Sequence, residues 1–514
     1  MTPSSPCTHR MTPASVNPRL DAAIWRAARA ASLLPIGIAL AAVVAVALGH
    51  RGVAFGLRLD PLGAVMLLLV AFIGWVIVRY SRDYLGGQAG QSRYAGWLMG
   101  TLAAVASVAV ADNLALLALA WIAASLCVHR LLTFFRDRAP ARVAAHKKFV
   151  VARAADVCMV AAVALLAAGY GTLQLSAITA QVAVGTLPLA APVQLAIGLV
   201  ALAALLKCAQ LPVHGWLIQV MEAPTPVSAL LHAGVVNLGG FVLMRFAPLV
   251  AEVPAAQVLL VLVGSATAVL AALVMSTRIS IKVMLAWSTS AQMGFMLMQC
   301  GLGAWGLALL HLLAHSLYKA HAFLSAGAIV QAHAEWVQAP PRAPLKAPAL
   351  IAGLLLSLVM VAAAGWLWSP LPGSAGLATA LPGASVPWLL SAIVAVSLVP
   401  LLQARAGAGW LLPGMWSGLG AFGVASLYFL LHAASASFGV ITADPPAWLL
   451  LWVGLLFAAL FAVQSCVALA PRGAVARRLY PWFYGGLFLD ECFTRLLLRN
   501  DRPVDSSRAT QRKS

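Results

Sequence analysis

Apolar runs of about 20 residues recur along most of this chain, and each is long enough to cross the hydrocarbon core of a bilayer. Only 9% of the 514 residues are charged, whereas a soluble domain carries about 25%. This pattern predicts an all-α polytopic membrane protein. We expect about 14 membrane-spanning segments, at residues 31–48, 61–79, 94–111, 113–134, 148–169, 191–219, 225–248, 255–275, 281–301, 304–333, 347–368, 387–404, 410–433 and 447–470.

The placement of basic residues predicts the orientation of these segments. The formal net charge is +19, which in other contexts indicates nucleic-acid binding. Here most lysines and arginines occupy short loops on the side of the N-terminus, which is the pattern of a membrane protein's cytoplasmic face. We therefore expect no nucleic-acid partner, two cytoplasmic termini and a bacterial inner (cytoplasmic) membrane.

Three regions follow from the pattern. Residues 1–30 form a cytoplasmic N-terminal segment, 31–470 the membrane domain, and 471–514 a cytoplasmic C-terminal segment. The stretch 476–500 mixes aromatic, leucine and arginine side chains. We interpret it as amphipathic, lying at the membrane interface or against a partner. Its acidic residues make a fifteenth span the weaker interpretation.

The seven cysteines lack CxxC spacing, and no nucleotide or cofactor motif is present. The sequence thus predicts no cofactor, no metal site and no catalytic site in this chain.

Residues 206–240 place ionisable side chains inside apolar sequence. Lys207 and His232 lie near proline-marked breaks, and Pro212 follows Lys207 closely. Ionisable groups in a membrane usually face a polar pathway, and broken helices are tolerated where protein or a water-filled cavity satisfies the backbone. Burial favours the neutral amine, so such a lysine can exchange a proton. A snorkelling lysine is the alternative.

A second group has helical spacing. His311, His315 and Lys319 recur at every fourth residue, which stacks them on one helix face. This face could relay protons. Packing histidines and a zinc site are the alternatives, although the lysine would repel a cation.

Other polar residues allow two interpretations. Asp156 follows Arg153 by one turn, which predicts either a structural ion pair or a carboxylate that tunes Lys207. His214 could cap the backbone or take part in transport. Weaker candidates follow: Glu222, Lys282, His321 and His333.

Several motifs resemble the proton-translocating subunits of respiratory complex I and the Mrp cation/proton antiporters. They occupy residues 58–67, 111–121, 148–157, 206–234 and 281–296. The resemblance implies two inverted repeats, each with a broken helix, and a polar axis across the membrane centre. It implies ion-translocation roles for the following residues: Asp156, Lys207, His232, His311, His315 and Lys319.

Two positions depart from that pattern. Ile122 occupies the place of the family's first-repeat glutamate, and Pro370 lies near the place of the second-repeat lysine. The long lateral helix of the large complex I subunit is also not expected here. These departures disfavour a respiratory proton pump.

The run at 121–132, the basic loop before 148 and the C-terminal segment resemble one branch, the membrane-embedded subunits of DAB inorganic carbon transporters. That resemblance implies translocation of H⁺ or Na⁺ that drives accumulation of bicarbonate or CO₂. It also implies a large cytoplasmic partner, which resembles β-carbonic anhydrases and carries zinc. A transporter subunit rather than an enzyme is expected. The alternatives are a complex I subunit or a Mrp antiporter subunit.

Overall fold

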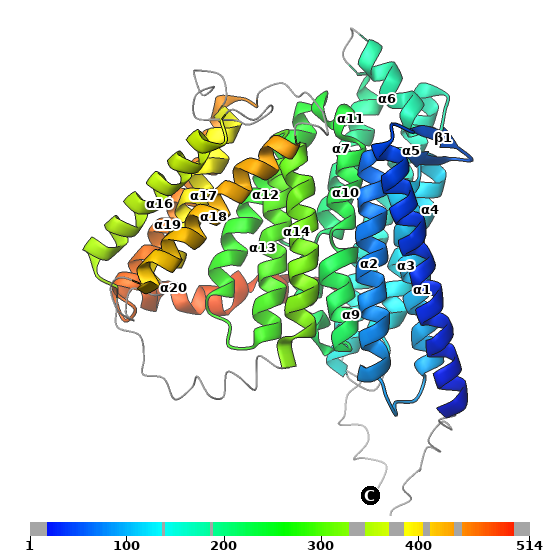
Figure 1. The fold of residues 1–514 in the computed structure, drawn as a ribbon, viewed down its shortest axis with the longest axis horizontal. Helices are drawn as coiled ribbons and strands as arrows, with labels where there is room; N and C mark the ends of the chain where they lie inside the picture. The colour runs from blue at the N-terminus through cyan, green and yellow to red at the C-terminus, as the bar shows by residue number, and fades with distance from the viewer. Residues whose placement is uncertain are drawn as a thin grey trace, which may run out of the picture.

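The computed structural model describes residues 18–135, 139–185, 189–327, 345–369, 385–403, 412–435 and 445–497. Helices dominate it, which confirms the all-α class (Figure 1). A short antiparallel hairpin, β1 (Gly52–Ala54) with β2 (Leu57–Leu59), follows the first helix.

The helices of the first part of the chain are α1 (Pro18–Ala47), α2 (Pro61–Tyr84), α3 (Gln91–Val110), α4 (Leu114–Leu132), α5 (Ala139–Tyr170), α6 (Leu175–Val184), α7 (Ala191–Lys207), α8 (Gly215–Gln219), η1 (Val220–Glu222), α9 (Thr225–Leu230), η2 (Leu231–Val235), α10 (Leu238–Arg245) and α11 (Ala247–Ala251). The later helices are α12 (Pro254–Met275), α13 (Ile281–Gly301), α14 (Trp305–Leu324), α16 (Ala347–Leu367), α17 (Ser385–Gln403), α18 (Leu412–Ser435), α19 (Ala447–Leu469), α20 (Ala474–Tyr484), η5 (Gly486–Phe488) and α21 (Leu489–Leu497).

Eleven helices in the described residues are long and apolar enough to cross a membrane, so the expected count of 14 is not confirmed. The expected segments outside the eleven are the broken pair α7–α8, α13 and α14. Helix α7 has only 17 residues, while α13 and α14 carry polar side chains along their length. Each of these three segments is therefore either interrupted or polar along its length.

Helix α1 begins well before residue 31, where we expected the first span. The helix continues beyond its apolar part, and the Trp25 indole there donates a 2.7 Å hydrogen bond to Gln91. This contact ties the start of α1 to α3.

Two local breaks shape the centre of the bundle. Helix α7 ends at Lys207, and the backbone becomes helical again only at Gly215. Pro212 lies in the gap and has no N–H to donate to a helix. Helix η2 is a single π-helical turn between α9 and α10, a feature often found at functional positions.

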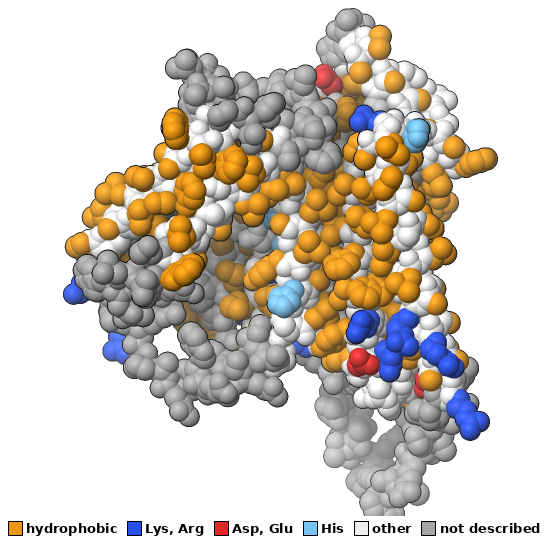
Figure 2. All heavy atoms as spheres, in the orientation of Figure 1, with side chains coloured by type: hydrophobic (Ala, Val, Ile, Leu, Met, Phe, Trp, Pro, Cys, Tyr) orange, Lys and Arg blue, Asp and Glu red, His pale blue; other side chains and the backbone are white. Residues whose placement is uncertain are grey.

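Figure 1 shows α2 to α14 as one bundle and α16 to α19 as a tilted group beside it. Helices α12 and α13 pack through small residues, since a Cβ added at Gly264 would lie 2.6 Å from the Gly294 carbonyl oxygen. Close backbone approach of this kind is typical of membrane helices. Apolar side chains cover the middle of the face shown in Figure 2, and basic side chains gather at the end where α1 begins.

Candidate functional site

Lys207 forms the first polar centre at the end of α7. Its ammonium donates to the Ser125 hydroxyl at 2.9 Å and to the Trp121 carbonyl at 3.3 Å, both on α4. It also lies 4.2 Å from the centre of the Trp121 ring. Only 6% of Lys207 is exposed, so the ammonium is enclosed by protein rather than reaching an interface.

A second lysine reaches the same serine. The Lys148 ammonium donates to the Ser125 carbonyl at 2.6 Å, and Lys148 is 4% exposed. The expected span here began at residue 148, whereas α5 begins earlier, at Ala139, so Lys148 lies well inside a helix. Ser125 therefore joins two buried lysines, which interact electrostatically.

Asp156 lies on α5 and is buried. Its carboxylate pairs with Arg153 at 2.6 Å, which is the ion pair anticipated from their spacing. It also interacts electrostatically with Lys207 and Lys148. No hydrogen bond from Lys207 to Asp156 occurs in the described residues, so Asp156 acts on Lys207 only through the field of its charge.

Ile122 occupies the position where the family resemblance led us to expect a glutamate. Ile122 is a half-buried hydrophobic residue packed against the main core. One turn later the Ser125 hydroxyl accepts from Lys207, so the side-chain acceptor of this lysine is neutral. Sequence reasoning missed this contact, because a serine in an apolar helix is indistinguishable from a packing residue.

His232 forms part of a second polar centre, on the π-helical turn η2. It is fully buried, and its ring stacks on Phe323 with centroids 4.4 Å apart. Neither ring nitrogen has a hydrogen-bond partner among the described residues. Buried polar groups are usually paired, so both nitrogens are available to a transient ion or water.

The predicted relay on α14 surrounds this histidine. The rings of His311 and His315 are 6.1 Å apart, and His315 interacts electrostatically with Lys319 and His232. The His311 Nδ1 lies 3.1 Å from a side-chain oxygen of Gln299 on α13. The four predicted residues thus gather in one place, as their spacing suggested, with a partner that sequence reasoning missed.

The Lys319 ammonium donates to the Leu285 carbonyl at 3.0 Å and is fully buried. Within the described residues there is no cluster of three or more metal-binding side chains. This centre therefore consists of histidine imidazoles and one lysine amine.

The two polar centres are not connected by any hydrogen bond or ion pair in the part of the chain that the structure describes. Next to Lys207, the Cys208 thiol donates to the Val236 carbonyl, which is four residues after His232. An ion moving from one to the other would need a step through this region.

Two weaker candidates have definite contacts. Lys282 does not simply face outward, since its ammonium donates to the Thr225 hydroxyl at 2.8 Å. The His214 Nδ1 lies 3.3 Å from the Pro212 carbonyl, but the His214 side chain makes no hydrogen bond that caps α8. The side chain of Glu222, His333 and Pro370 lie outside the described residues.

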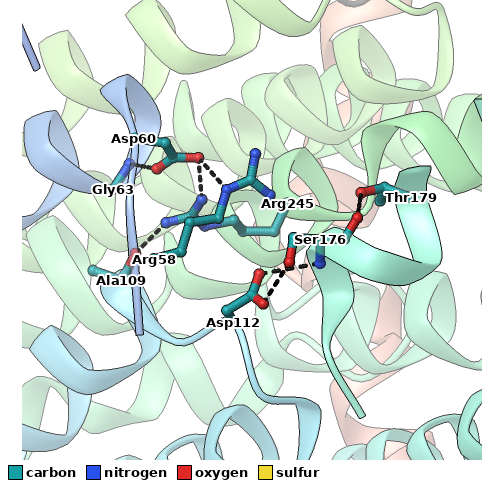
Figure 3. A network of polar contacts seen from close by, with 8 residues as sticks. All are labelled: Arg58, Asp60, Gly63, Ala109, Asp112, Ser176, Thr179 and Arg245. Atoms are coloured by element: carbon teal, nitrogen blue, oxygen red, sulfur yellow. Dashed lines mark hydrogen bonds and ion pairs between the residues drawn. The ribbon is translucent and has the colours of Figure 1, made fainter. Parts of the chain in front are cut away.

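A third polar network lies at the opposite end of the molecule from α20. Figure 3 shows Arg245 of α10 between Asp60 and a backbone carbonyl of α3. Arg58 reaches the same carboxylate at 3.1 Å, and the Ser176 hydroxyl donates to Asp112 at 2.7 Å. These bonds hold the β1–β2 hairpin and α6 against the bundle.

Comparisons with known proteins place this arrangement in a family. The family model "NADH:quinone oxidoreductase/Mrp antiporter, TM" matches residues 111–366, and "NADH-Ubiquinone oxidoreductase (complex I), chain 5 N-terminus" matches residues 46–95. A probable inorganic carbon transporter subunit DabB of Hydrogenovibrio crunogenus is 42% identical over 92% of this chain and 90% of its own length. The chain belongs to the DabB family.

More distant relatives share the membrane core. The NADH-quinone oxidoreductase subunit L of Escherichia coli is 34% identical over 55% of this chain and 46% of its own length. The solved Mrp complex of Dietzia sp. contains a chain with a TM-score of 0.62 and 25% identity, covering 95% of this chain and 60% of that one. The DabB-family chain is thus a multi-pass membrane transport subunit within the complex I and Mrp superfamily, as the sequence predicted.

Proposed function

We propose that this chain is the ion-translocating membrane subunit of an energy-coupled inorganic carbon transporter. It moves H⁺ or Na⁺, and that movement drives accumulation of bicarbonate or CO₂. The observation that carries the proposal is the pair of buried lysines joined by Ser125 beside the break in α7. Buried amines of this kind are costly to insert and mark ion pathways.

The proposed path has two parts. The Lys207 amine takes up the transferred charge at the helix break. The negative charge of Asp156 shifts the protonation equilibrium of that amine. His232 and the His311–His315–Lys319 face of α14 continue the path across the centre. The helices α16 to α19 have no lysine, arginine, aspartate or glutamate, so this path lies in the first part of the bundle.

The carbon chemistry is assigned to a partner. The family resemblance implies a large cytoplasmic protein, DabA, which resembles β-carbonic anhydrases and carries zinc. The proposed location is a bacterial inner membrane with both termini in the cytoplasm, and the basic end in Figure 2 supports that orientation. The carbon species, the ion and the partner are those that the family resemblance implies.

The test is growth in air of a strain without carbonic anhydrase that co-expresses both chains. Lys207→Ala should abolish rescue without loss of membrane insertion, because removing a buried lysine eases insertion by about 2.5–3.5 kcal/mol. Lys346→Ala, which changes an exposed lysine before α16, is the matched control. Full rescue by a well-expressed Lys207→Ala variant contradicts the proposal.

A Mrp-type cation/proton antiporter subunit is the second candidate, favoured by the structural likeness to the Mrp chain. It predicts ion exchange without any dependence on inorganic carbon or on a zinc-bearing partner. Ion flux that is unchanged when the partner and bicarbonate are omitted would favour this candidate.

A further inference from the structure

The C-terminal segment reaches back into the membrane domain through one carboxylate. Asp490, near the start of α21, accepts from the Lys147 ammonium at 3.0 Å and from the Gln219 amide at 2.6 Å. Lys147 is on α5 and 1% exposed, and Gln219 ends α8. One acid therefore ties the tail to two membrane elements, and Asp490 is removed from Lys147 by 343 positions in the sequence.

The space around Asp490 is fitted to it. At Gly215, the first residue of α8, an added Cβ would lie 1.5 Å from an Asp490 carboxylate oxygen. His214 immediately precedes this glycine and is fully buried. The His214 side chain interacts electrostatically with Asp490, Lys147 and Arg278. Its ring lies 4.8 Å from the Trp287 ring. Asp490 therefore lies against α8, the helix that follows the break after Lys207.

The same part of α5 faces both the tail and the ion path. Lys147 points to Asp490, whereas Lys148 points to Ser125 and so to Lys207. Consecutive helical residues differ by about 100° in direction, which sends the two ammonium groups to different sides. A shift of the tail at Lys147 therefore acts on α5 one residue from Lys148.

The remainder of the tail lies across the bundle end and presents aromatic rings outward. Figure 1 shows α20 crossing near the ends of α12 and α13, and the Arg278 guanidinium donates to the Phe483 carbonyl at 3.3 Å. Four aromatic rings of the tail are about half exposed: Tyr480, Trp482, Tyr484 and Phe488. Exposed aromatics at a polar boundary are typical of interaction surfaces.

We infer that Asp490 is a positioning residue that couples the C-terminal segment to the Lys207 path, so that partner binding on the tail is transmitted to the broken helix α7–α8. This inference rests on the proposed function and deepens it. The Asp490 carboxylate accepts from Lys147 and Gln219, which both belong to this chain. It neutralises Lys147 and holds α8 and α5 in one arrangement relative to the tail.

The experiment uses the co-expressed complex and two measurements, rescue of growth in air and ion flux in proteoliposomes with and without the partner. Asp490→Asn leaves a buried, unpaired Lys147, so the double variant Lys147→Met/Asp490→Asn removes both charges and protects folding. Glu491→Gln, on the exposed neighbour, is the charge control. Gly215→Ala displaces Asp490 by contact, and Gly198→Ala, with no atom within 4 Å of its added Cβ, is the matched glycine control.

We expect the double variant and Gly215→Ala to insert normally and to co-purify with the partner. Their stimulation of ion flux by the partner should fall about tenfold, the size expected for a coupling residue. Both controls should behave as wild type. A purely structural ion pair can be replaced by two neutral residues, so wild-type stimulation in the double variant overturns the inference.

Loss of partner co-purification in the double variant would place Asp490 in the docking surface and would also overturn the inference. Lys207→Ala, measured in parallel, separates the two proposals. If Lys207→Ala retains flux, the proposed function fails. If Lys207→Ala loses flux while the double variant retains its stimulation, only the coupling role of Asp490 fails.

Discussion

At the scale of single residues, two buried ammonium groups beside the helix break are held by neutral acceptors. Lys207 and Lys148 each donate to Ser125 rather than to a carboxylate. A hydroxyl satisfies an ammonium without neutralising it, so the positive charge on this face stays sensitive to Asp156 and to any ion that approaches.

Ser125→Ala should therefore weaken transport while leaving the fold intact. It removes the side-chain acceptor of Lys207, and a hydrogen bond to a charged group contributes about 1.5–3 kcal/mol. We expect inorganic carbon uptake to fall by about 10-fold to 100-fold, with Ser125→Thr close to wild type because it keeps the hydroxyl. Equal uptake by the alanine and threonine variants would show that Lys207 does not depend on this contact.

The three residues on the α14 face should behave as one unit. Single alanine variants of His311, His315 and Lys319 should each be severely impaired, and the double histidine variant little worse than the worse single, because residues acting together are non-additive. His321→Ala, on an exposed position of α14, is the control. Losses in ion flux that multiply would instead indicate separate sites or packing roles.

At the scale of elements, the positions of the helix breaks were easier to predict from the sequence than the contacts that residues near the breaks make. Proline and apolar patterning placed the interruption after Lys207, and the structure has it there. The Asp490 contact with Lys147 could not be foreseen, because it joins residues far apart in the chain. The same holds for Ser125, which no local pattern distinguishes from a packing residue.

Helix spacing was predictable only where side chains repeat on one face. The three α14 residues lie together, as their spacing of four residues predicted. The start of α5 was placed too late, since a basic stretch was interpreted as a loop. Lys147 and Lys148 are buried there because each finds a specific acceptor, a tertiary fact that composition cannot show.

The packing of α12 on α13 should be sensitive to one methyl group. A Cβ at Gly294 would lie 2.5 Å from the Gly264 carbonyl oxygen, so Gly294→Ala forces the two backbones apart. We expect a loss of about 1–3 kcal/mol in stability, seen as a lower thermal unfolding temperature in detergent. Gly96→Ala on α3, with nothing within 4 Å of its added Cβ, should not change it; a similar loss in both variants would argue against close packing at α12.

At the scale of the whole molecule, the proposed function gives ion movement to the membrane bundle and carbon chemistry to a partner. The described residues form a bundle with short connections and a C-terminal segment that lies across one end (Figure 1). Exposed aromatic rings on that segment provide a surface where a large soluble protein can bind. Under the inference drawn above, Asp490 links this proposed docking surface to the proposed ion path.

Removal of residues 479–499 should abolish both co-purification with the partner and rescue of growth in air. The deletion takes away the aromatic surface together with Asp490, whereas the Asp490 variants leave the surface in place. Membrane insertion of the truncated chain should persist, because the eleven apolar helices precede the deletion. Unchanged co-purification would count against docking on the tail.

The most direct test of ion-driven carbon transport is uptake of radiolabelled bicarbonate by proteoliposomes that contain this chain and its partner. An imposed gradient of H⁺ or Na⁺ should drive accumulation, an ionophore that dissipates that gradient should stop it, and Lys207→Ala should show none. Accumulation that is independent of both ion gradients, or that persists at the wild-type rate in Lys207→Ala, would contradict the account.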